Sequence, residues 1–356
     1  MIEVKISNFN NIWLISDIHF GVRSNSLEWI QNIVNYFNNF FIPLIKNNKK
    51  DNDICCILGD IFDNRQNIDI DVFNKASDVI EDISKILPVH MICGNHDLYK
   101  KNDTDVNSLR GFKNIQNVNV YEVPTILNNG DNCILMLPWL GESFDESKLN
   151  NYKIDYIFAH SDIQGFKYDN GKDITKGLSL KDINLKRVYS GHIHKRQENN
   201  NWVYLGSPYH TKRSDIDNVK GIYCLHTSDN THTFYKNDYS PIFQKIHINN
   251  LLELTLSQVI GALNNNYTDI IISQDYINTF NLSKFIDLLN GCNYKNIITI
   301  PEKKSNFDLV INDDSDSKSI EELLYDTLKQ TASTDAEFEL LLKLNNKYFQ
   351  LANKEE

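Results

Sequence analysis

The chain has 356 residues, of which 41% are hydrophobic and 23% are charged, a composition that excludes a largely disordered protein and allows one large domain and a smaller one. It contains no apolar stretch near the ~20 residues that span a membrane and no signal-peptide pattern, so we expect a cytoplasmic protein with no membrane partner. The formal net charge of −11 argues against a broad basic surface for nucleic acid, and six cysteines without a Cys-x-x-Cys pair are expected to be free thiols.

Five short apolar runs, each typical of a buried strand, are followed by residues that bind metals. The runs are residues 13–15, 55–58, 91–93, 156–159 and 187–189. The polar residues that follow them are, in chain order, Asp17 with His19, Asp60, Asn95, His160, and His192 with His194. Because ligands bind at the carboxyl ends of strands in α/β sheets, we expect these side chains to meet in one crevice.

These side chains are of the types that hold a pair of divalent ions. A carboxylate can span two cations, which makes Asp60 the natural bridge, while imidazoles and an amide oxygen fill the other positions. Two ions about 3.5–4 Å apart can stabilise both the attacking and the leaving oxygen of a displacement at phosphorus. Asp17 and His19 can both face the site only if the chain bends after Asp17. Any one motif is more often a hydrogen-bonded pair than a metal site, but five in order predict a two-metal phosphoesterase.

His96 and Asp97 directly follow Asn95, so we expect the His96 ring at the rim of the cluster. An imidazolium there can protonate an alkoxide leaving group as a general acid, while Asp97 would hold the ring and raise its pKa. The alternative is that His96 only packs in the turn. Arg65, shortly after Asp60, is a candidate for a bidentate contact to phosphate, although an arginine in a loop is usually solvated. His90 is expected to be structural.

Between the apolar runs, residues 30–45 and 72–87 have apolar side chains at helical spacing, so the first half alternates strand and helix. Strand-like segments follow at 202–205, around Ile222 and at 231–235. The mixture predicts an α/β fold, an α+β sandwich whose two sheets are flanked by helices, over residues 1–245.

Two basic pairs lie close to the later motifs, and both are candidate contacts to a phosphate backbone. They are Lys195 with Arg196, directly after His194, and Lys212 with Arg213. Basic pairs in loops are more often only solvated. Bound metal ions would add local positive charge that the formal net charge omits.

From residue 246 the pattern changes, and residues 246–305 are predicted to form a small α/β domain. Its predicted elements are helices around residues 256–263 and 282–289 and strands at 270–272 and 296–300. Residues 306–318 form an acidic linker. Residues 319–356 are predicted to form two helices, each starting with a capping box. The second helix is amphipathic and would either pack on its own domain or bind a partner.

The chain resembles the calcineurin-like metallophosphoesterase superfamily in five motifs. These are Asp17-Ile18-His19, Gly59-Asp60-Ile61-Phe62-Asp63, Gly94-Asn95-His96-Asp97, His160 and Gly191-His192-Ile193-His194. Within the superfamily, Leu205-Gly206-Ser207-Pro208 and the following Gly221-Ile222-Tyr223-Cys224-Leu225 are similar to SbcD-type nuclease subunits of double-strand-break repair. Met136-Leu137-Pro138-Trp139 and other stretches resemble the small subunits of T4-type phage recombination endonucleases.

The resemblance implies a specific set of ligands and partners. One ion would be held by Asp17, His19, Asp60 and His194, and the other by Asp60, Asn95, His160 and His192. His96 would be the catalytic histidine and Mn²⁺ the working ion. The resemblance also implies a small capping domain that shapes DNA access, pairing of two copies, and a coiled-coil ATPase of the SbcC type that binds the C-terminal helices. Some relatives carry a functional histidine where this chain has Asp63, so that role is not carried over.

We therefore expect a Mn²⁺-dependent DNA exonuclease and endonuclease that hydrolyses phosphodiester bonds at DNA ends or hairpins, together with the ATPase, in recombination and repair. A small-molecule phosphodiesterase or phosphatase of the same superfamily is the alternative, since the same metal site serves both and the acidic charge suits such substrates. A non-catalytic scaffold is the third hypothesis. Its expected signature is missing ligands, whereas every ligand position is filled here.

Overall fold

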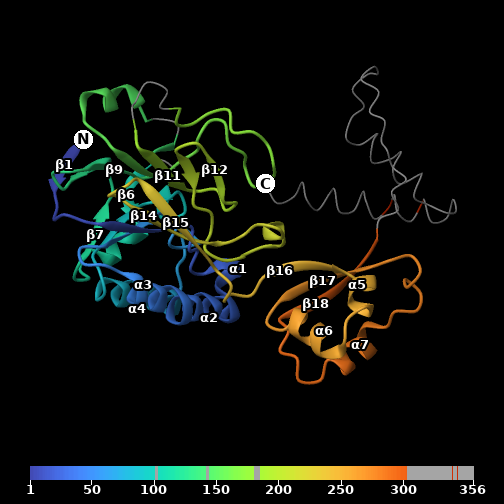
Figure 1. Ribbon diagram of the computed structural model, residues 1–356. Coiled ribbons are helices and arrows are strands. Elements are labelled where there is room, and N and C mark those ends of the chain that lie inside the picture. Colours follow the sequence, from blue (N-terminus) through green and yellow to red (C-terminus); the bar gives the residue numbers. More distant parts are fainter. Residues whose placement is uncertain (101–102, 142–143, 180–184, 303–338, 340–342, 344–356) are drawn as a thin grey trace, which may run out of the picture. The chain divides into compact units, whose positions relative to one another are not determined.

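The computed structural model describes residues 1–100, 103–141, 144–179, 185–302, 339 and 343 (Figure 1). Residues 1–302 form one compact unit. The predicted acidic linker at 306–318 and almost all of the predicted helices at 319–356 lie outside the described residues. None of the helices in the described part of the chain has both the length and the apolar character needed to cross a membrane.

Two large sheets form the centre of the compact unit. The seven-stranded sheet has the order β1 (Ile2–Lys5), β8 (Thr125–Asn128), β9 (Cys133–Leu137), β10 (Tyr156–His160), β11 (Arg187–Gly191), β13 (Trp202–Tyr204) and β12 (Gln197–Asn199). The six-stranded sheet has the order β15 (Thr231–Lys236), β14 (Gly221–His226), β2 (Asn11–Ile15), β3 (Ile54–Leu58), β4 (Val89–Ile92) and β7 (Val118–Tyr121). In each sheet the strands that precede the predicted ligands are paired in parallel.

Alternation along the buried strands explains why the two sheets stack and why helices cover the outside. In β2, Trp13 and Ile15 pack in a core shared with the helices, whereas Ile12 and Leu14 pack in a second core with Tyr189 of the other sheet. Since successive side chains of a strand point to opposite faces, a strand buried on both faces is a continuous apolar run. The predicted two-sheet core flanked by helices is confirmed.

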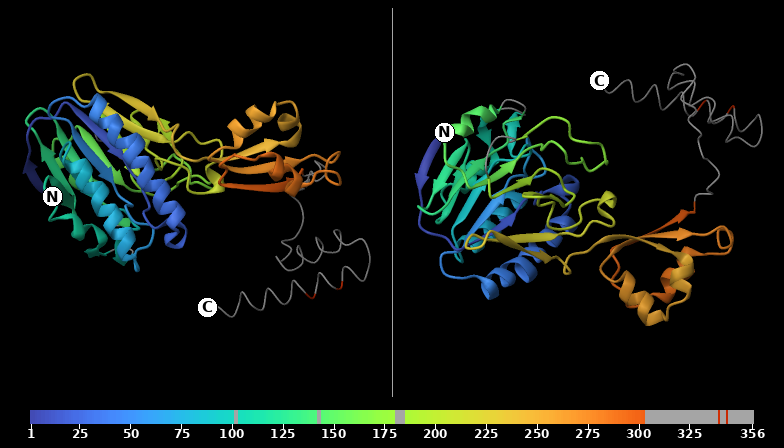
Figure 2. Two further views of the ribbon diagram at one scale, coloured as in Figure 1. Left: turned by 90° about the horizontal axis from the view of Figure 1, so that it is seen from below. Right: turned by 45° about the horizontal axis from the view of Figure 1, so that its top comes forward.

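Helices pack on the outer face of the six-stranded sheet, and Figure 2 shows two of them side by side in blue. They are α2 (Leu27–Tyr36), which continues through a π-helical turn (Phe37–Phe41) into α3 (Ile42–Asn48), and α4 (Ile70–Ser84). The predicted helices at 30–45 and 72–87 are therefore confirmed with shifted ends. Shorter elements are α1 (Val22–Asn25), β5 (Leu98–Lys100), β6 (Asp103–Asn107) and the 3-10 turns Ser108–Phe112, Glu146–Asn151 and Arg213–Asp215.

A small parallel sheet follows the sandwich and has a core of its own. Its strands are β16 (Phe243–His247), β17 (Tyr267–Ile272) and β18 (Asn296–Pro301), with helices α5 (Ile248–Leu252), α6 (Leu256–Leu263) and α7 (Leu282–Leu288). The two predicted strands and two predicted helices of this region are confirmed. The first strand begins at Phe243, inside the range predicted for the large domain, because only Phe243 and Ile246 of its five residues are apolar and the pattern is weak.

Candidate metal centre

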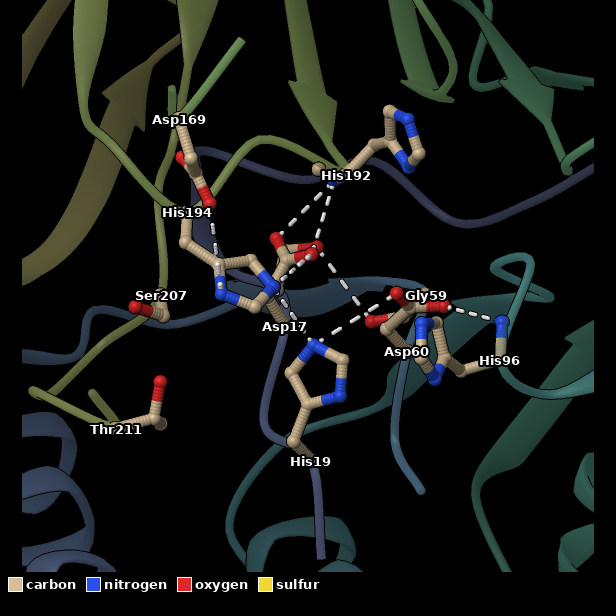
Figure 3. A network of polar contacts seen from close by, with 12 residues as sticks. Asp17, His19, Gly59, Asp60, His96, Asp169, His192, His194, Ser207 and Thr211 are labelled. Atoms are coloured by element: carbon tan, nitrogen blue, oxygen red, sulfur yellow. Dashed lines mark hydrogen bonds and ion pairs between the residues drawn. The ribbon is translucent and has the colours of Figure 1, made fainter. Parts of the chain in front are cut away.

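All seven predicted metal ligands meet at the carboxyl ends of β2, β3, β4, β10 and β11. Figure 3 shows Asp17, His19, Asp60, His192 and His194 among them. Four of them have a left-handed backbone, which turns each side chain into the crevice just after its strand ends. These are Asp17 (φ 55°), His19 (φ 53°), Asp60 (φ 52°) and His192 (φ 90°). The expected bend after Asp17 is thus formed by left-handed residues. Such conformations are costly for residues with a Cβ and concentrate at functional sites.

Two glycines let the ligand-bearing turns approach one another closely. A Cβ at Gly94 would overlap the Asp60 carboxylate, and a Cβ at Gly191 would overlap the Ser16 hydroxyl and the Leu58 carbonyl. Only glycine fits at these two contacts, which explains why a glycine directly precedes Asn95 and another directly precedes His192.

The first group of ligands contains Asp17, His19 and His194, with Asp60 beside them. The Nε2 atoms of His19 and His194 lie 2.9 Å apart. The His194 Nε2 lies 4.0 Å from Asp17 Oδ1, and the His19 Nε2 lies 3.7 Å from Asp60 Oδ2. These nitrogen and oxygen atoms therefore face a common point, as the ligands of one cation do.

The second group contains Asn95, His160 and His192, again with Asp60. The Asn95 Oδ1 lies 3.0 Å from His160 Nε2 and 2.8 Å from His192 Nδ1. The His160 Nε2 lies 3.4 Å from Asp60 Oδ2. The same Asp60 oxygen thus faces both groups, which is the geometry of a bridging carboxylate.

The carboxylates and imidazoles of the site shift one another's pKa values. Burial opposes the charged form of His160, but the Asp60 and Asp17 carboxylates outweigh burial and raise the pKa of His160 to about 9. An ion bound at His160 would therefore displace its proton. Burial, followed by the neighbouring His19, lowers the pKa of His194 well below its usual range, so its ring is neutral and its Nε2 can act as a ligand. Burial alone would raise the pKa of Asp60, but the imidazoles of His160, His19 and His96 outweigh burial and hold that pKa well below its usual range. Two carboxylates, four imidazoles and an amide oxygen are a donor set that Mn²⁺, Fe²⁺ and Zn²⁺ all accept.

His96 lies at the rim of the cluster, as predicted. Its ring Nδ1 donates a hydrogen bond to the backbone carbonyl of Asp63 at 2.6 Å, and its backbone N–H donates to Asp60 Oδ1 at 2.8 Å. The ring is half-buried and stands edge-on to His19, with 5.1 Å between the centroids. Because Nδ1 keeps its proton to donate to the Asp63 carbonyl, a neutral His96 ring carries its lone pair on Nε2. Nε2 is therefore the atom that would exchange a proton with a substrate.

Asp97 does not hold the His96 ring, so that part of the prediction is wrong. The Asp97 side chain is buried and points under the Asp60 turn, where it accepts hydrogen bonds from four backbone N–H groups. The donors are Asp60 at 2.8 Å, Ile61 at 3.0 Å, Phe62 at 3.3 Å and Gly94 at 2.9 Å. Neighbouring residues of a tight turn point in different directions, so the carboxylate next to His96 in the chain shapes the backbone around Asp60 instead.

Three further carboxylates face the outer ring nitrogens of the histidine ligands, and sequence reasoning gave them no role. The atom pairs are Asp63 Oδ1 with His19 Nδ1 at 3.3 Å, Asp162 Oδ1 with His192 Nε2 at 3.3 Å, and Asp169 Oδ2 with His194 Nδ1 at 3.9 Å. Carboxylates in this position orient metal-binding imidazoles. Asp63 and Asp162 lie within three residues of a ligand, a signal that could have found them, whereas Asp169 carries no such signal.

The five predicted phosphate-binding cations divide into two sets. Three of them have partners within the chain: Lys212 Nζ with Asp169 Oδ2 at 2.8 Å, Arg213 Nε with Asp269 Oδ1 at 3.0 Å, and Arg196 with the Tyr223 hydroxyl at 3.2 Å and over the Phe234 ring. Arg65 and Lys195 have no side-chain partner in the part of the chain that the structure describes, so their charges are available to a ligand.

His90 is structural, as predicted. The side chain is buried in β4, and its Nδ1 forms a hydrogen bond with the Tyr121 hydroxyl at 2.8 Å. The two rings are stacked with centroids 5.9 Å apart. Burial lowers the pKa of His90 to about 4, so the ring is neutral at physiological pH.

Comparison with known proteins places this site in a family. The sequence profile of the calcineurin-like phosphoesterases matches residues 11–196. Exonuclease subunit 1 of Enterobacteria phage T4 is 27% identical over 269 residues, which are 71% of this chain and 78% of that protein. Putative phosphoesterase 244L of Invertebrate iridescent virus 6 is 28% identical over 206 residues, which are 55% of this chain and 69% of that protein.

Among solved structures, the protein of unknown function AQ665 from Aquifex aeolicus is 16% identical, with a TM-score of 0.25 over 44% of this chain and 80% of that chain. The family match is the informative one, since it covers more than half of the chain and contains all seven predicted ligands and His96. The predicted family and the predicted metal-dependent chemistry are confirmed: the chain belongs to the calcineurin-like phosphoesterase family and is a metal-dependent phosphoesterase.

Proposed function

We propose that the chain is the nuclease subunit of a DNA recombination and repair complex and hydrolyses phosphodiester bonds at DNA ends or hairpins. The observation that carries this proposal is the similarity to Exonuclease subunit 1 of phage T4. That similarity extends over 269 residues, whereas the phosphoesterase profile covers only residues 11–196, so the shared sequence is more than the metal site alone. Mn²⁺ is the proposed working ion, and the donor set accepts it.

The geometry supports different roles for Asp60 and His96 in the reaction. Two ions, when bound, supply positive charge at the attacking and leaving oxygens of a displacement at phosphorus. Asp60 holds the two ligand groups together, since its carboxylate faces both. His96 donates a proton from Nε2 to the leaving alkoxide, and the Asp63 carbonyl keeps the ring in the orientation this requires.

For DNA contact we propose Arg65 and Lys195, the two predicted cations whose side chains have no partner in the described chain. Arg196, Lys212 and Arg213 would each have to leave an internal partner to reach a phosphate. With a net charge of −11, the chain needs positive charge from another source to hold DNA tightly. We propose that a coiled-coil ATPase, bound through residues 319–356, supplies this positive charge. We also propose that two copies of the chain pair and that the protein acts in the cytoplasm.

A second candidate function is hydrolysis of small phosphodiesters or phosphomonoesters. The similarity to putative phosphoesterase 244L of Invertebrate iridescent virus 6 and the acidic net charge favour it. The same metal centre serves either substrate, so the ligands cannot separate the two functions.

Cleavage assays with purified full-length protein test the proposal. Protein freed of metal and supplied with Mn²⁺ is incubated with linear duplex DNA, hairpin DNA and bis-p-nitrophenyl phosphate, with and without a coiled-coil ATPase of the SbcC type. We expect DNA cleavage that is lost in Asp60→Asn. Hydrolysis of the small diester with no DNA cleavage under any of these conditions would reject the nuclease proposal and support the alternative.

The role of the C-terminal segment is tested separately. A variant that ends at residue 318 keeps the compact unit 1–302 whole. We expect it to cleave the small diester as the full chain does and to lose binding to the ATPase in size-exclusion chromatography. Unchanged ATPase binding would contradict the proposed docking role.

A further inference from the structure

We propose that Lys220 is a positioning residue of the first ion site, the site of Asp17, His19 and His194. It acts through a brace, which we define as Lys220 together with residues 207–215. This inference rests on the metal site proposed above and not on the choice of DNA as the substrate.

Lys220 is a buried cation whose three N–H groups all reach acceptors. The side chain is 4% exposed, and its Nζ donates to the His194 carbonyl at 2.6 Å, to Ser207 Oγ at 2.9 Å and to Asp215 Oδ1 at 2.9 Å. No other lysine among the described residues is buried. Because an ammonium group is costly to bury unless it is fully paired, Lys220 holds these three acceptors in a fixed arrangement.

Asp215 closes the rest of the brace into a compact turn. Its Oδ2 accepts hydrogen bonds from the backbone N–H groups of Thr211 at 2.8 Å and Lys212 at 3.1 Å, while its Oδ1 faces Lys220. The Ser207 backbone N–H adds a second hydrogen bond to the His194 carbonyl at 3.1 Å, and Figure 3 shows Ser207 beside His194. Two donors of the brace therefore fix one carbonyl, that of a metal ligand.

The brace also holds the other ligand-bearing segment of the first site. The buried Tyr209 hydroxyl donates to the backbone carbonyl of Ile18, the residue between Asp17 and His19. Two segments 175 positions apart in the sequence, which carry His19 and His194, are thus tied to a single loop. In the described chain, no hydrogen bond joins this loop to the side chains of the second-site ligands.

The brace contacts the ligand-bearing segments of the first ion site and not the ligand side chains of the second, and this difference distinguishes positioning of metal ligands from general stabilisation of the fold. If the brace only stabilised the fold, its loss would lower the melting temperature and weaken both ion sites together or neither. If it positions His194 and the residues on either side of Ile18, its loss weakens the first site alone. Changes to residues that orient metal ligands typically reduce metal affinity about 10- to 100-fold.

Mn²⁺ titration by isothermal calorimetry tests the inference on metal-free, full-length protein. The Asn95→Ala variant lacks a ligand of the second site, so the Mn²⁺ affinity that it retains identifies the binding step of the first site. In Lys220→Met and in the milder Tyr209→Phe we expect first-site affinity to fall about 10- to 100-fold and about 10-fold, respectively, with second-site affinity unchanged. Tyr209→Phe removes only a hydroxyl group, so it decides the question if Lys220→Met does not fold.

Asp53→Asn is the matched control. Asp53 is also buried and hydrogen-bonded, to the backbone and side chain of Asn11 and to the Trp13 indole, but it precedes β3 and so lies at the opposite ends of the strands from the site. We expect it to lower the melting temperature and leave both Mn²⁺ affinities intact. Wild-type affinities in Tyr209→Phe and in folded Lys220→Met, or equal loss at both sites, would overturn the brace. A wild-type protein that binds no Mn²⁺ would reject the metal site itself.

Discussion

Replacing Asp97 with asparagine separates the role that the structure gives this residue from the role predicted by its place beside His96. The Asp97 Oδ2 accepts from the N–H groups of Asp60 and Gly94, and its Oδ1 accepts from those of Ile61 and Phe62. An asparagine has one oxygen, so it can serve only one of these pairs. Its amide group would face the other pair, donor against donor.

The size of the effect follows from the two N–H groups left without an acceptor. Asp97 is 1% exposed, so water cannot replace the lost oxygen. Each unsatisfied buried N–H costs about 1–3 kcal/mol, which gives roughly 2–6 kcal/mol in the free energy of unfolding. For a domain of this size, each kcal/mol corresponds to about 2–4 °C, so we expect the melting temperature to fall by about 4 °C or more.

The assay is thermal unfolding of metal-free Asp97→Asn followed by Mn²⁺ titration, with Asp71→Asn as the control. Asp71 is exposed in the first turn of α4, and its replacement should leave the melting temperature unchanged. Asp97→Asn should also weaken Mn²⁺ binding, since the turn that carries Asp60 loses its support. An unchanged melting temperature with normal Mn²⁺ binding and lost cleavage would refute this reasoning and restore a catalytic role for Asp97.

Three further predictions address the acid, a buried histidine and a cation. His96→Asn should keep the full metal content, measured by elemental analysis, and slow cleavage about 10²- to 10⁴-fold, since the general acid is lost. Burial lowers the pKa of His90 to about 4, so as the pH falls below about 6.5 the unfolded chain binds a proton at His90 before the folded chain does. Wild-type protein should therefore lose up to about 3 kcal/mol of stability between pH 6.5 and 4. In melting experiments, the stability of His90→Phe should depend less on pH over this range. Arg213→Gln leaves the buried Asp269 carboxylate without its cation, so we expect faster proteolysis of the segment that forms the small parallel sheet. Weaker DNA binding at unchanged stability would instead support the predicted phosphate contact.

The positions of the proposed metal ligands could be predicted from sequence because each of them lies at or shortly after the end of a buried strand. A short apolar run fixes where a buried strand stops, and parallel strands bring their carboxyl ends to one edge of the sheet. Asp60 and His160, for example, come directly at or after the ends of β3 and β10, and they lie 3.4 Å apart although 100 residues separate them in the sequence. The two-sheet fold follows from the same runs.

The partners of the ligands could not be predicted in the same way. Which side chain of a turn points inward depends on backbone angles that the apolar pattern does not specify. Asp97 and His96 are neighbours, yet one is buried under the Asp60 turn and the other faces the rim. Asp169 reaches the site from a loop whose course is set by tertiary packing. Lys220 lies directly before β14, at the amino end of a strand and not at the carboxyl end where ligands are expected.

The proposed ligands are divided between the two sheets, which explains why each motif alone is weak evidence for a metal site and the ordered set of five is strong evidence. The six-stranded sheet carries Asp17, His19, Asp60 and Asn95, and the seven-stranded sheet carries His160, His192 and His194. Each proposed ion site therefore takes ligands from both sheets. The core between the sheets sets the distance between the ligands, and the His160 Nδ1 donates across it to the Leu58 carbonyl at 2.7 Å. A motif from one sheet therefore indicates a metal site only when the motifs from the other sheet are also present, and all five motifs are present in this chain.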